Sequence, residues 1–393
     1  METHRVYLDH NATSPLRPKV ARLWRELSAE GLGNPSSLHH SGRRARAVID
    51  DARARIAQAL GVLEDEIVFT SGGTESNNLA LFGLPGRGAI VTTPIEHSAV
   101  LKVTEELARR GRLIKYVAIG PRGRINPEQV AFTMDSAQVD LVSIGLANNE
   151  LGTVQPLADL APYFETAERR PKLHIDAVQA LGRVPLDLSG SLAHVDLASF
   201  SMHKLGGPLG VGVLFVRRGT QLGPLAFGGG HEEGLRPGTE NAPAIAASAL
   251  AVELAVAGRA AEAERLGTLT RAIWKALSEK NDDLVLLGPP LDEPHARLQN
   301  TLLFLAPGRD ARMLVTRLDQ LGIEVSAGSA CASGAVERSH VLDAIGLDED
   351  RARSGLRLSI GWNTTGADCK HAVEVMGKAF SPEYATRDSS IDL

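Results

Sequence analysis

Short apolar runs alternate with longer segments of helical periodicity between residues 66 and 216. Several runs are continuously apolar, which is typical of strands covered on both faces. In chain order the runs are EIVFT, GAIVTT, RLIKYVAI, VDLVSIGLA, KLHIDAV, VDLASFS and VGVLFV. The segments between them, such as SAVLKVTEELARRG, place apolar residues at helical spacing. This alternation predicts an α/β domain with a mostly parallel sheet and a ligand site beyond the carboxyl ends of the strands.

A second pattern begins in the Ala-rich region around residues 242 to 280. After it, NTLLFLA and RLSIGWN predict strands, and GRDARMLVTRLDQLG predicts an amphipathic helix. These elements indicate a smaller α+β domain. Near the N-terminus, RARAVIDDARARI mixes charges of both signs at helical spacing, which predicts a solvated helix face.

Composition narrows the classes of protein. The net charge of -5 over 393 residues gives no general attraction to nucleic acid or to an anionic membrane. Two cysteines exclude a disulfide framework and a four-cysteine metal site, and we expect no metal. The opening METHRVYLDHNATSP lacks a signal-peptide pattern, and we see no apolar run long enough to cross a bilayer. We therefore expect a cytoplasmic protein.

Glycines follow the first predicted strand, in SGGTESNN. Gly73 and Thr74 would begin a helix there, where free backbone N–H groups and the helix dipole favour a phosphate. An ordinary helix cap explains the same residues equally well.

Two later strands also end in residues whose side chains could take part in binding or catalysis. Asp176 ends one strand, with Gln179 three positions on, and would need a cation or a strong donor if buried; a helix-capping Asp is the alternative. Ser201, His203 and Lys204 follow another strand, where a desolvated lysine could form a Schiff base; a solvent-facing lysine is the alternative. Together, a phosphate cradle, a carboxylate for a pyridinium nitrogen and a lysine for an aldehyde are the contacts that pyridoxal 5'-phosphate requires.

One cysteine, Cys331, lies in SAGSACASGAVERSH, where almost every near neighbour is Ser, Ala or Gly. Buried cysteines usually pack among other apolar side chains. This composition offers little to pack against and indicates a thiol on a flexible tether.

Nine motifs in order resemble the cysteine desulfurases of the NifS and IscS type, which are fold-type I, class V pyridoxal-phosphate enzymes. They are YLDHNATSP, GNPSSLHHSG, VFTSGGTESNNLA, IEHSAVL, NNELGTVQP, HIDAVQALG, SMHKLGGPLGVG, GGGHEEGLRPGTEN and SAGSACASG. The resemblance runs from about residue 6 to about residue 365. It implies a large cofactor-binding domain over residues 14–255 with a mostly parallel seven-stranded sheet. It also implies a small α+β domain over residues 256–393, joined by residues 1–13, that carries the cysteine loop.

The resemblance implies that four side chains contact the cofactor ring. Lys204 would bind the cofactor covalently, and Asp176 would keep the pyridine nitrogen protonated. Gln179 would donate to the ring phenolate oxygen. His97 would stack on the ring and assist proton transfer, although a single His is more often structural.

The resemblance also implies the phosphate, subunit and substrate contacts. The residues expected at the phosphate are Gly73, Thr74, Ser201 and His203. Thr239 would reach the phosphate of a neighbouring subunit, which implies a homodimer with shared active sites. Asn149 and Arg357 would bind the substrate, Arg357 through the carboxylate, with Asn149 also beside the cofactor.

The implied reaction removes sulfur from L-cysteine, giving L-alanine and a persulfide on Cys331 that passes to an acceptor protein. Iron–sulfur assembly, tRNA thiolation, DNA phosphorothioation and specialised biosynthesis all stay open as destinations of the sulfur. A selenocysteine lyase, another class V enzyme such as an aminotransferase, and a catalytically silent scaffold are the alternatives. Cys369 is expected to be an incidental helix residue. Asn77 and Leu209 depart from the family pattern, and we assign them no part in the chemistry.

Overall fold

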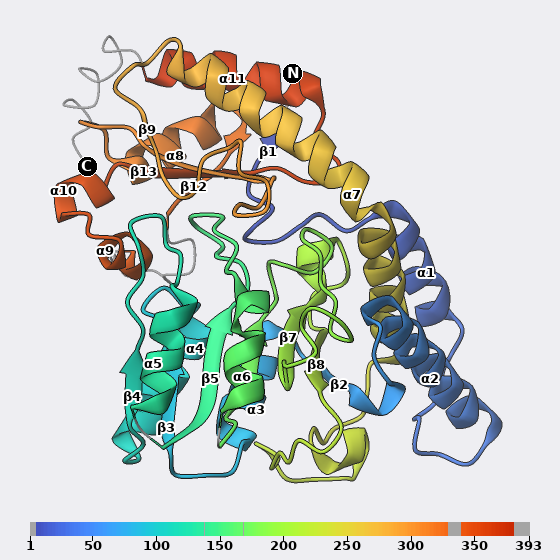
Figure 1. Ribbon diagram of the computed structural model, residues 1–393. Helices are drawn as coiled ribbons and strands as arrows, with labels where there is room; N and C mark the ends of the chain where they lie inside the picture. The colour runs from blue at the N-terminus through green and yellow to red at the C-terminus, as the bar shows by residue number, and fades with distance from the viewer. Residues whose placement is uncertain (1–4, 137, 168, 329–338, 381–393) are drawn as a thin grey trace.

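The computed structural model describes residues 5–136, 138–167, 169–328 and 339–380 (Figure 1). Within these residues, seven strands form the largest sheet, in the order β2-β8-β7-β6-β5-β3-β4. The strands are β2 (Ile67–Thr70), β3 (Ala89–Thr92), β4 (Ile114–Tyr116), β5 (Val139–Gly145), β6 (Lys172–Asp176), β7 (Leu197–Ser201) and β8 (Gly212–Val216). Each of the seven apolar runs contains one of them, so the prediction from the sequence is confirmed.

The sheet is parallel from β4 to β7, while β8 runs antiparallel to both β7 and β2. Neighbouring residues of one strand enter different cores, because successive side chains point to opposite faces. Phe69 lies in one core and Val68 in the other. Both faces are thus buried, which is why these strands read as continuous apolar runs.

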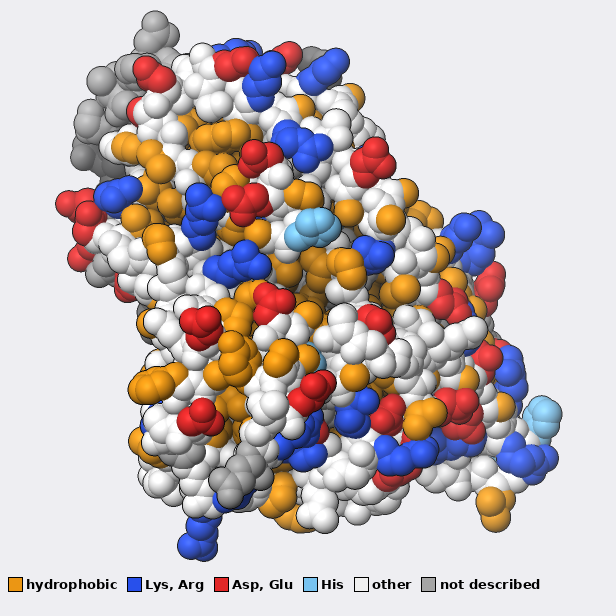
Figure 2. Space-filling model, viewed as in Figure 1, with side chains coloured by type: hydrophobic (Ala, Val, Ile, Leu, Met, Phe, Trp, Pro, Cys, Tyr) orange, Lys and Arg blue, Asp and Glu red, His pale blue; other side chains and the backbone are white. Residues whose placement is uncertain are grey.

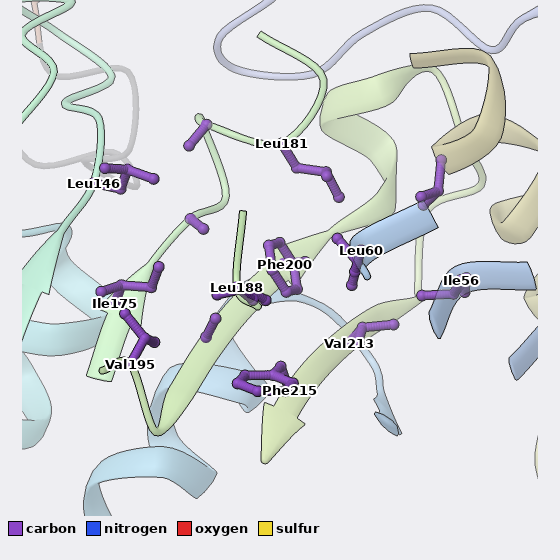
Figure 3. Close-up of a cluster of buried hydrophobic side chains, with 14 of the residues drawn as sticks. Ile56, Leu60, Leu146, Ile175, Leu181, Leu188, Val195, Phe200, Val213 and Phe215 are labelled. Carbon is purple, nitrogen blue, oxygen red and sulfur yellow. The ribbon is translucent and has the colours of Figure 1, made fainter. Parts of the chain in front are cut away.

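Helices cover both faces of this sheet (Figure 1). One core includes residues of α3 (Gly73–Gly83) and α4 (Ser98–Arg109). The other includes residues of α2 (His40–Leu60), α5 (Pro127–Asp135), α6 (Ala161–Thr166) and the first half of α7 (Ala242–Ser278). Figure 3 shows part of this second core, where Phe200 of β7 lies near Leu60 of α2 and Val213 of β8 lies near Ile56.

The charged residues of RARAVIDDARARI form the expected solvated face of a helix, α2, which also has a buried face. Ala45 and Ile49 are fully buried and belong to the same core as α7. On the exposed side, Arg55 forms an ion pair with Glu253 of α7 at 2.6 Å. Helix α2 therefore has two faces, one apolar and one charged, and the apolar face combines small residues such as Ala45 with larger ones such as Ile49.

The smaller unit is an α+β arrangement, as predicted. Its four-stranded antiparallel sheet has the order β12-β13-β10-β9. The strands are β9 (Val285–Leu286), β10 (Thr301–Leu305), β12 (Ser326–Ala327) and β13 (Gly355–Ser359), and β1 (Val6–Tyr7) pairs with β11 (Ile323–Glu324) beside them. The helices are α8 (Ala311–Gln320), α9 (His340–Ala344), α10 (Glu349–Ala352) and α11 (Gly366–Ala379). The remaining elements are α1 (Pro18–Ala29) and the short 3₁₀ turns η1 (Glu64–Glu66), η2 (Leu157–Leu160), η3 (Met202–Leu205) and η4 (His231–Gly234).

Helix α7 connects the two units along one side of the molecule (Figure 1). It is long and apolar enough to cross a membrane by length and composition, contrary to our expectation from the sequence. Its first half packs in the core of the large sheet, and Leu266, Ile273 and Leu277 pack in the core of the small one, as in a core helix of a soluble protein. The proposed boundary between residues 255 and 256 falls inside this helix. The division of the chain at this position stays a prediction.

Candidate active site

One cavity gathers most of the residues that the sequence singled out. It lies at the carboxyl ends of the parallel strands, where ligands of such sheets bind. The predicted residues that line it are Gly73, Thr74, His97, Asn149, Asp176, Gln179, Ser201, His203, Lys204 and Arg357. Nearly all come from the ends of different strands or the turns after them, so the sheet, and not sequence proximity, brings them together.

Lys204 lies in η3, directly after β7, and its amine points to the N-terminal segment. Nζ donates to the main-chain oxygens of Asn11 at 2.8 Å and Ala12 at 2.6 Å. Asn11 and Ala12 also line the cavity. We assigned them no role from the sequence, although they lie within the motif YLDHNATSP, and that motif was the available signal.

Asp176 is held by two donors at the end of β6. Its Oδ1 accepts from the backbone N–H of Val178 at 3.0 Å, and its Oδ2 accepts from Nδ2 of Asn77 at 2.7 Å. The carboxylate is 8% exposed. Asn77, to which we assigned no part in the chemistry, therefore lies in contact with a predicted cofactor-binding residue.

His97 caps the N-terminus of α4. Its Nδ1 accepts from the backbone N–H of Ala99 at 3.0 Å. Burial lowers the pKa of His97, the charge of Lys204 lowers it further, and Asp176 opposes both. A neutral imidazole that accepts at Nδ1 carries its proton on Nε2.

Glu96, beside His97, is a wall residue of the cavity that the sequence did not suggest. It accepts from the hydroxyl of Thr93 at 2.6 Å and from the backbone N–H of Gly145 at 2.8 Å. Burial raises the pKa of Glu96 to about 8. Its place next to a predicted His was the one signal in the sequence.

The start of α3, with Gly73 and Thr74, lines the cavity where we predicted the phosphate site. A Cβ atom on Gly73 would lie 2.6 Å from Cγ2 of Val178, so only glycine fits this approach of the helix to the neighbouring turn. Nearby, Nδ1 of His203 lies 2.9 Å from Oγ1 of Thr13. Burial, and then Lys204, lowers the pKa of His203 to about 4, so this imidazole acts as a neutral hydrogen-bonding group.

Arg357 forms the opposite end of the cavity, on β13 of the small sheet. It is 1% exposed, and its guanidinium donates to Oδ1 of Asp9 at 2.7 Å and to the main-chain oxygen of Asn149 at 3.2 Å. Its Nε is buried without a hydrogen-bond partner among the described residues. A buried, incompletely satisfied guanidinium is suited to binding a carboxylate.

Gln179 is held on both sides of its amide. Its Nε2 donates to the main-chain oxygen of Asn11 at 2.9 Å, and its Oε1 accepts from Arg183. The second hydrogen on Nε2 is the one available to a ligand in the cavity.

A model of the family described as aminotransferase class-V matches residues 6–371. The chain belongs to the class-V aminotransferase family. The cysteine desulfurase IscS of Dictyoglomus turgidum is 39% identical to this chain, over 94% of this chain and 93% of its own. A solved NifS-like protein is 35% identical, with a TM-score of 0.88 over 95% of this chain and 98% of its own. Another solved structure, SspA in complex with cysteine, is 32% identical, with a TM-score of 0.76 over 90% of this chain and 98% of its own. The resemblance and the fold class stated from the motifs are confirmed.

One predicted site residue of this class-V family member lies away from the cavity, and another lies outside the described residues. Thr239 is exposed and does not line the cavity of its own chain. Cys331 lies outside the described residues. Cys369 is buried in α11, within the core of the small sheet, and burial raises its pKa to about 11. A thiol held this way is poorly suited to nucleophilic attack.

Proposed function

We propose that this protein is a cysteine desulfurase that uses pyridoxal 5'-phosphate. The observation that carries the proposal is the single cavity that joins Lys204, Asp176 and His97 to the buried guanidinium of Arg357. Proteins named cysteine desulfurase match nearly the whole chain, which supports the same reaction.

The residues of the cavity fit the cofactor. The start of α3, with Ser201 and His203 beside it, would hold the phosphate. Asp176, held in place by its two donors, would pair with the ring nitrogen, and Lys204 would bind the aldehyde carbon. When bound, the cofactor supplies an electron sink that weakens the bonds at the α-carbon of an amino acid.

Arg357 and Asn149 would bind the amino-acid substrate. Arg357 lies within hydrogen-bond reach of both Asp9 and the Asn149 main chain, so its fork is already oriented. A substrate carboxylate would meet the second hydrogens of Nη1 and Nη2, which the bonds to Asn149 and Asp9 do not use. Proton movement falls to Nζ of Lys204 and Nε2 of His97, which line the same cavity.

Cys331 would take the sulfur. Its thiolate attacks the sulfur of L-cysteine, so that a sulfur–sulfur bond forms and the bond between Cβ and sulfur of the substrate breaks. The electron pair of that bond stays with the substrate carbon, which takes up a proton to give L-alanine. The balance is L-cysteine plus enzyme thiol giving L-alanine plus enzyme persulfide. A thiol reductant or an acceptor protein then removes the sulfur.

An aminotransferase needs no thiol, and the Ser/Gly/Ala-rich segment around Cys331 argues against that reaction. A selenocysteine lyase would use the same cavity, and a comparison of the rates with L-cysteine and L-selenocysteine separates the two enzymes.

We further propose a cytoplasmic homodimer in which the exposed Thr239 contacts the cofactor phosphate of the partner subunit. Figure 2 shows acidic and basic side chains mixed over one face, so this face has no patch of one charge for a nucleic acid or an anionic membrane.

The deciding experiment is incubation of the purified protein with L-cysteine and dithiothreitol. We expect L-alanine and sulfide in equal amounts, together with the yellow absorbance of the cofactor. Pyruvate and ammonia in place of alanine would indicate elimination. Colourless protein that forms no alanine, even after the cofactor is added, would favour a silent scaffold.

A further inference from the structure

Both ends of the segment that carries Cys331 are attached to the cavity. Before the segment, Ser326 of β12 pairs with Arg357. Gly328 is the last described residue ahead of the segment. A Cβ atom on Gly328 would lie 3.5 Å from Oε2 of Glu150. After the segment, the hydroxyl of Ser339 donates to the same Oε2 at 2.6 Å. One buried carboxyl group thus lies beside both ends.

Glu150 directly follows the predicted substrate residue Asn149. It is 3% exposed, and burial raises its pKa. Burying a carboxyl group is costly unless it meets a donor, and the Ser339 hydroxyl is such a donor. The same hydroxyl accepts from the backbone N–H of Leu342 at 3.2 Å and so caps α9. A helix cap alone requires only the accepting role, and an apolar side chain at position 150 would fill the space without the cost.

A second contact ties α9 to the other side of the cavity. Nε2 of His340 lies 2.8 Å from the main-chain oxygen of Glu96. Because a carbonyl oxygen only accepts, Nε2 donates in this contact. Glu96 immediately precedes His97, so this bond reaches the neighbour of a predicted catalytic residue.

The apolar side of α9 reinforces both contacts. Val341 and Leu342 are 1% exposed and share one core cluster with Ile95 and Leu151. These two residues flank the Glu96–His97 and Asn149–Glu150 pairs in sequence. Helix α9 is therefore joined to the turns after β3 and β5, the same turns that supply His97 and Asn149.

We propose that Glu150, Ser339 and His340 are positioning residues for the sulfur-transfer step. They fix the C-terminal end of the segment that carries Cys331 to the turns that hold His97 and Asn149. The role rests on the proposed function, because it concerns delivery of a thiol to a bound cysteine. It does not concern cofactor binding, since none of the three contacts involves Lys204, Asp176 or the start of α3.

The test compares variants of the full-length, cofactor-loaded enzyme. Ser339→Ala removes the donor to Glu150, and His340→Leu removes the donor to Glu96. We expect each to slow alanine release at saturating L-cysteine by about tenfold or more, as for other losses of reactive geometry. The absorbance change on L-cysteine binding and its concentration dependence should stay at wild-type values. Ser339→Thr and His340→Gln keep a hydroxyl and an N–H, and should restore most of the rate.

Thr365→Ala is the matched control, because Thr365 caps α11 in the same unit and its hydroxyl bonds only to Asp368 among the contacts described. It should release alanine at the wild-type rate. Should Ser339→Ala unfold, the double variant Ser339→Ala/Glu150→Gln removes the unpaired buried charge and gives the same kinetic test.

Wild-type alanine release in Ser339→Ala and His340→Leu would overturn the positioning role, as would a loss matched by falling cofactor content and melting temperature. A wild-type enzyme that releases no alanine would instead overturn the proposed function itself.

Discussion

Asn77 of α3 donates its side-chain amide to Asp176 of β6 at 2.7 Å, across 99 positions of sequence. The bond fixes the orientation of the carboxylate. Helix α3 thus contributes to the cavity at two places, because Gly73, at its start, lines the cavity as well.

Replacing Asn77 with Leu should weaken cofactor retention and activity. The carboxylate loses one charged hydrogen bond, worth about 1.5–3 kcal/mol, or roughly ten- to a hundredfold in affinity. The measurement is the dissociation constant of the cofactor from titration of the apoenzyme. Asn78→Ala is the control, since Asn78 donates only to the Thr74 carbonyl of its own helix. Equal affinities for wild type and Asn77→Leu would refute the role.

Lys204→Ala should abolish covalent attachment of the cofactor. Among the described residues, Lys204 is the lysine that lines the cavity. Borohydride reduction followed by peptide mass spectrometry should find the pyridoxyl group on Lys204 in the wild type. Lys102→Ala, which removes an exposed lysine paired with Glu105, should leave the label in place. Label on any other lysine contradicts the assignment.

Cys331→Ser should separate binding from sulfur transfer. A serine hydroxyl is far less nucleophilic than a thiolate at neutral pH. The variant should stay yellow and change its spectrum when L-cysteine is added, but release almost no alanine and form no persulfide. Cys369→Ala should behave like the wild type in all four signals. Alanine release by Cys331→Ser at the wild-type rate would show that another route removes the sulfur.

Thr239→Ala should weaken cofactor retention only modestly, since the phosphate would keep its contacts at the start of α3. Sedimentation should show a dimer at assay concentration. A fully active monomer would exclude shared active sites, and an unchanged cofactor affinity in Thr239→Ala would exclude this residue from the partner's phosphate.

Acid should destabilise the protein through its buried histidines. His174 lies between the hydroxyls of Ser143 and Ser199, and burial lowers its pKa to about 4. In the unfolded state this histidine binds a proton below about pH 6.5, whereas in the folded state it binds one only below about pH 4. The free energy of unfolding therefore falls as pH falls through this window. From pH 7 to pH 5 this histidine accounts for about 2 kcal/mol.

Urea unfolding at the two pH values measures this loss. His174→Gln keeps the polar contacts in reach and removes the titration, so its loss should be smaller than that of the wild type. His371, which is half-buried in α11, supplies the control variant His371→Gln. An equal pH dependence in wild type and His174→Gln would contradict the assignment.

The sequence by itself determined the seven strands of the large sheet and the chemistry at their ends. Buried parallel strands must be apolar on both faces, so EIVFT and its counterparts can be recognised locally. The carboxyl ends of parallel strands lie along one edge, so polar residues that follow them, such as Asp176 and Lys204, can be predicted to meet.

The tertiary structure alone decided which partner each of these residues has. Asn77 meets Asp176, the carbonyls of Asn11 and Ala12 meet Lys204, and Glu150 meets Ser339. Each contact joins segments far apart in the chain, and its geometry depends on how helices pack on the sheet and how the small unit closes over its edge. Local periodicity indicates which face of a helix or strand is buried but not which distant residue it meets.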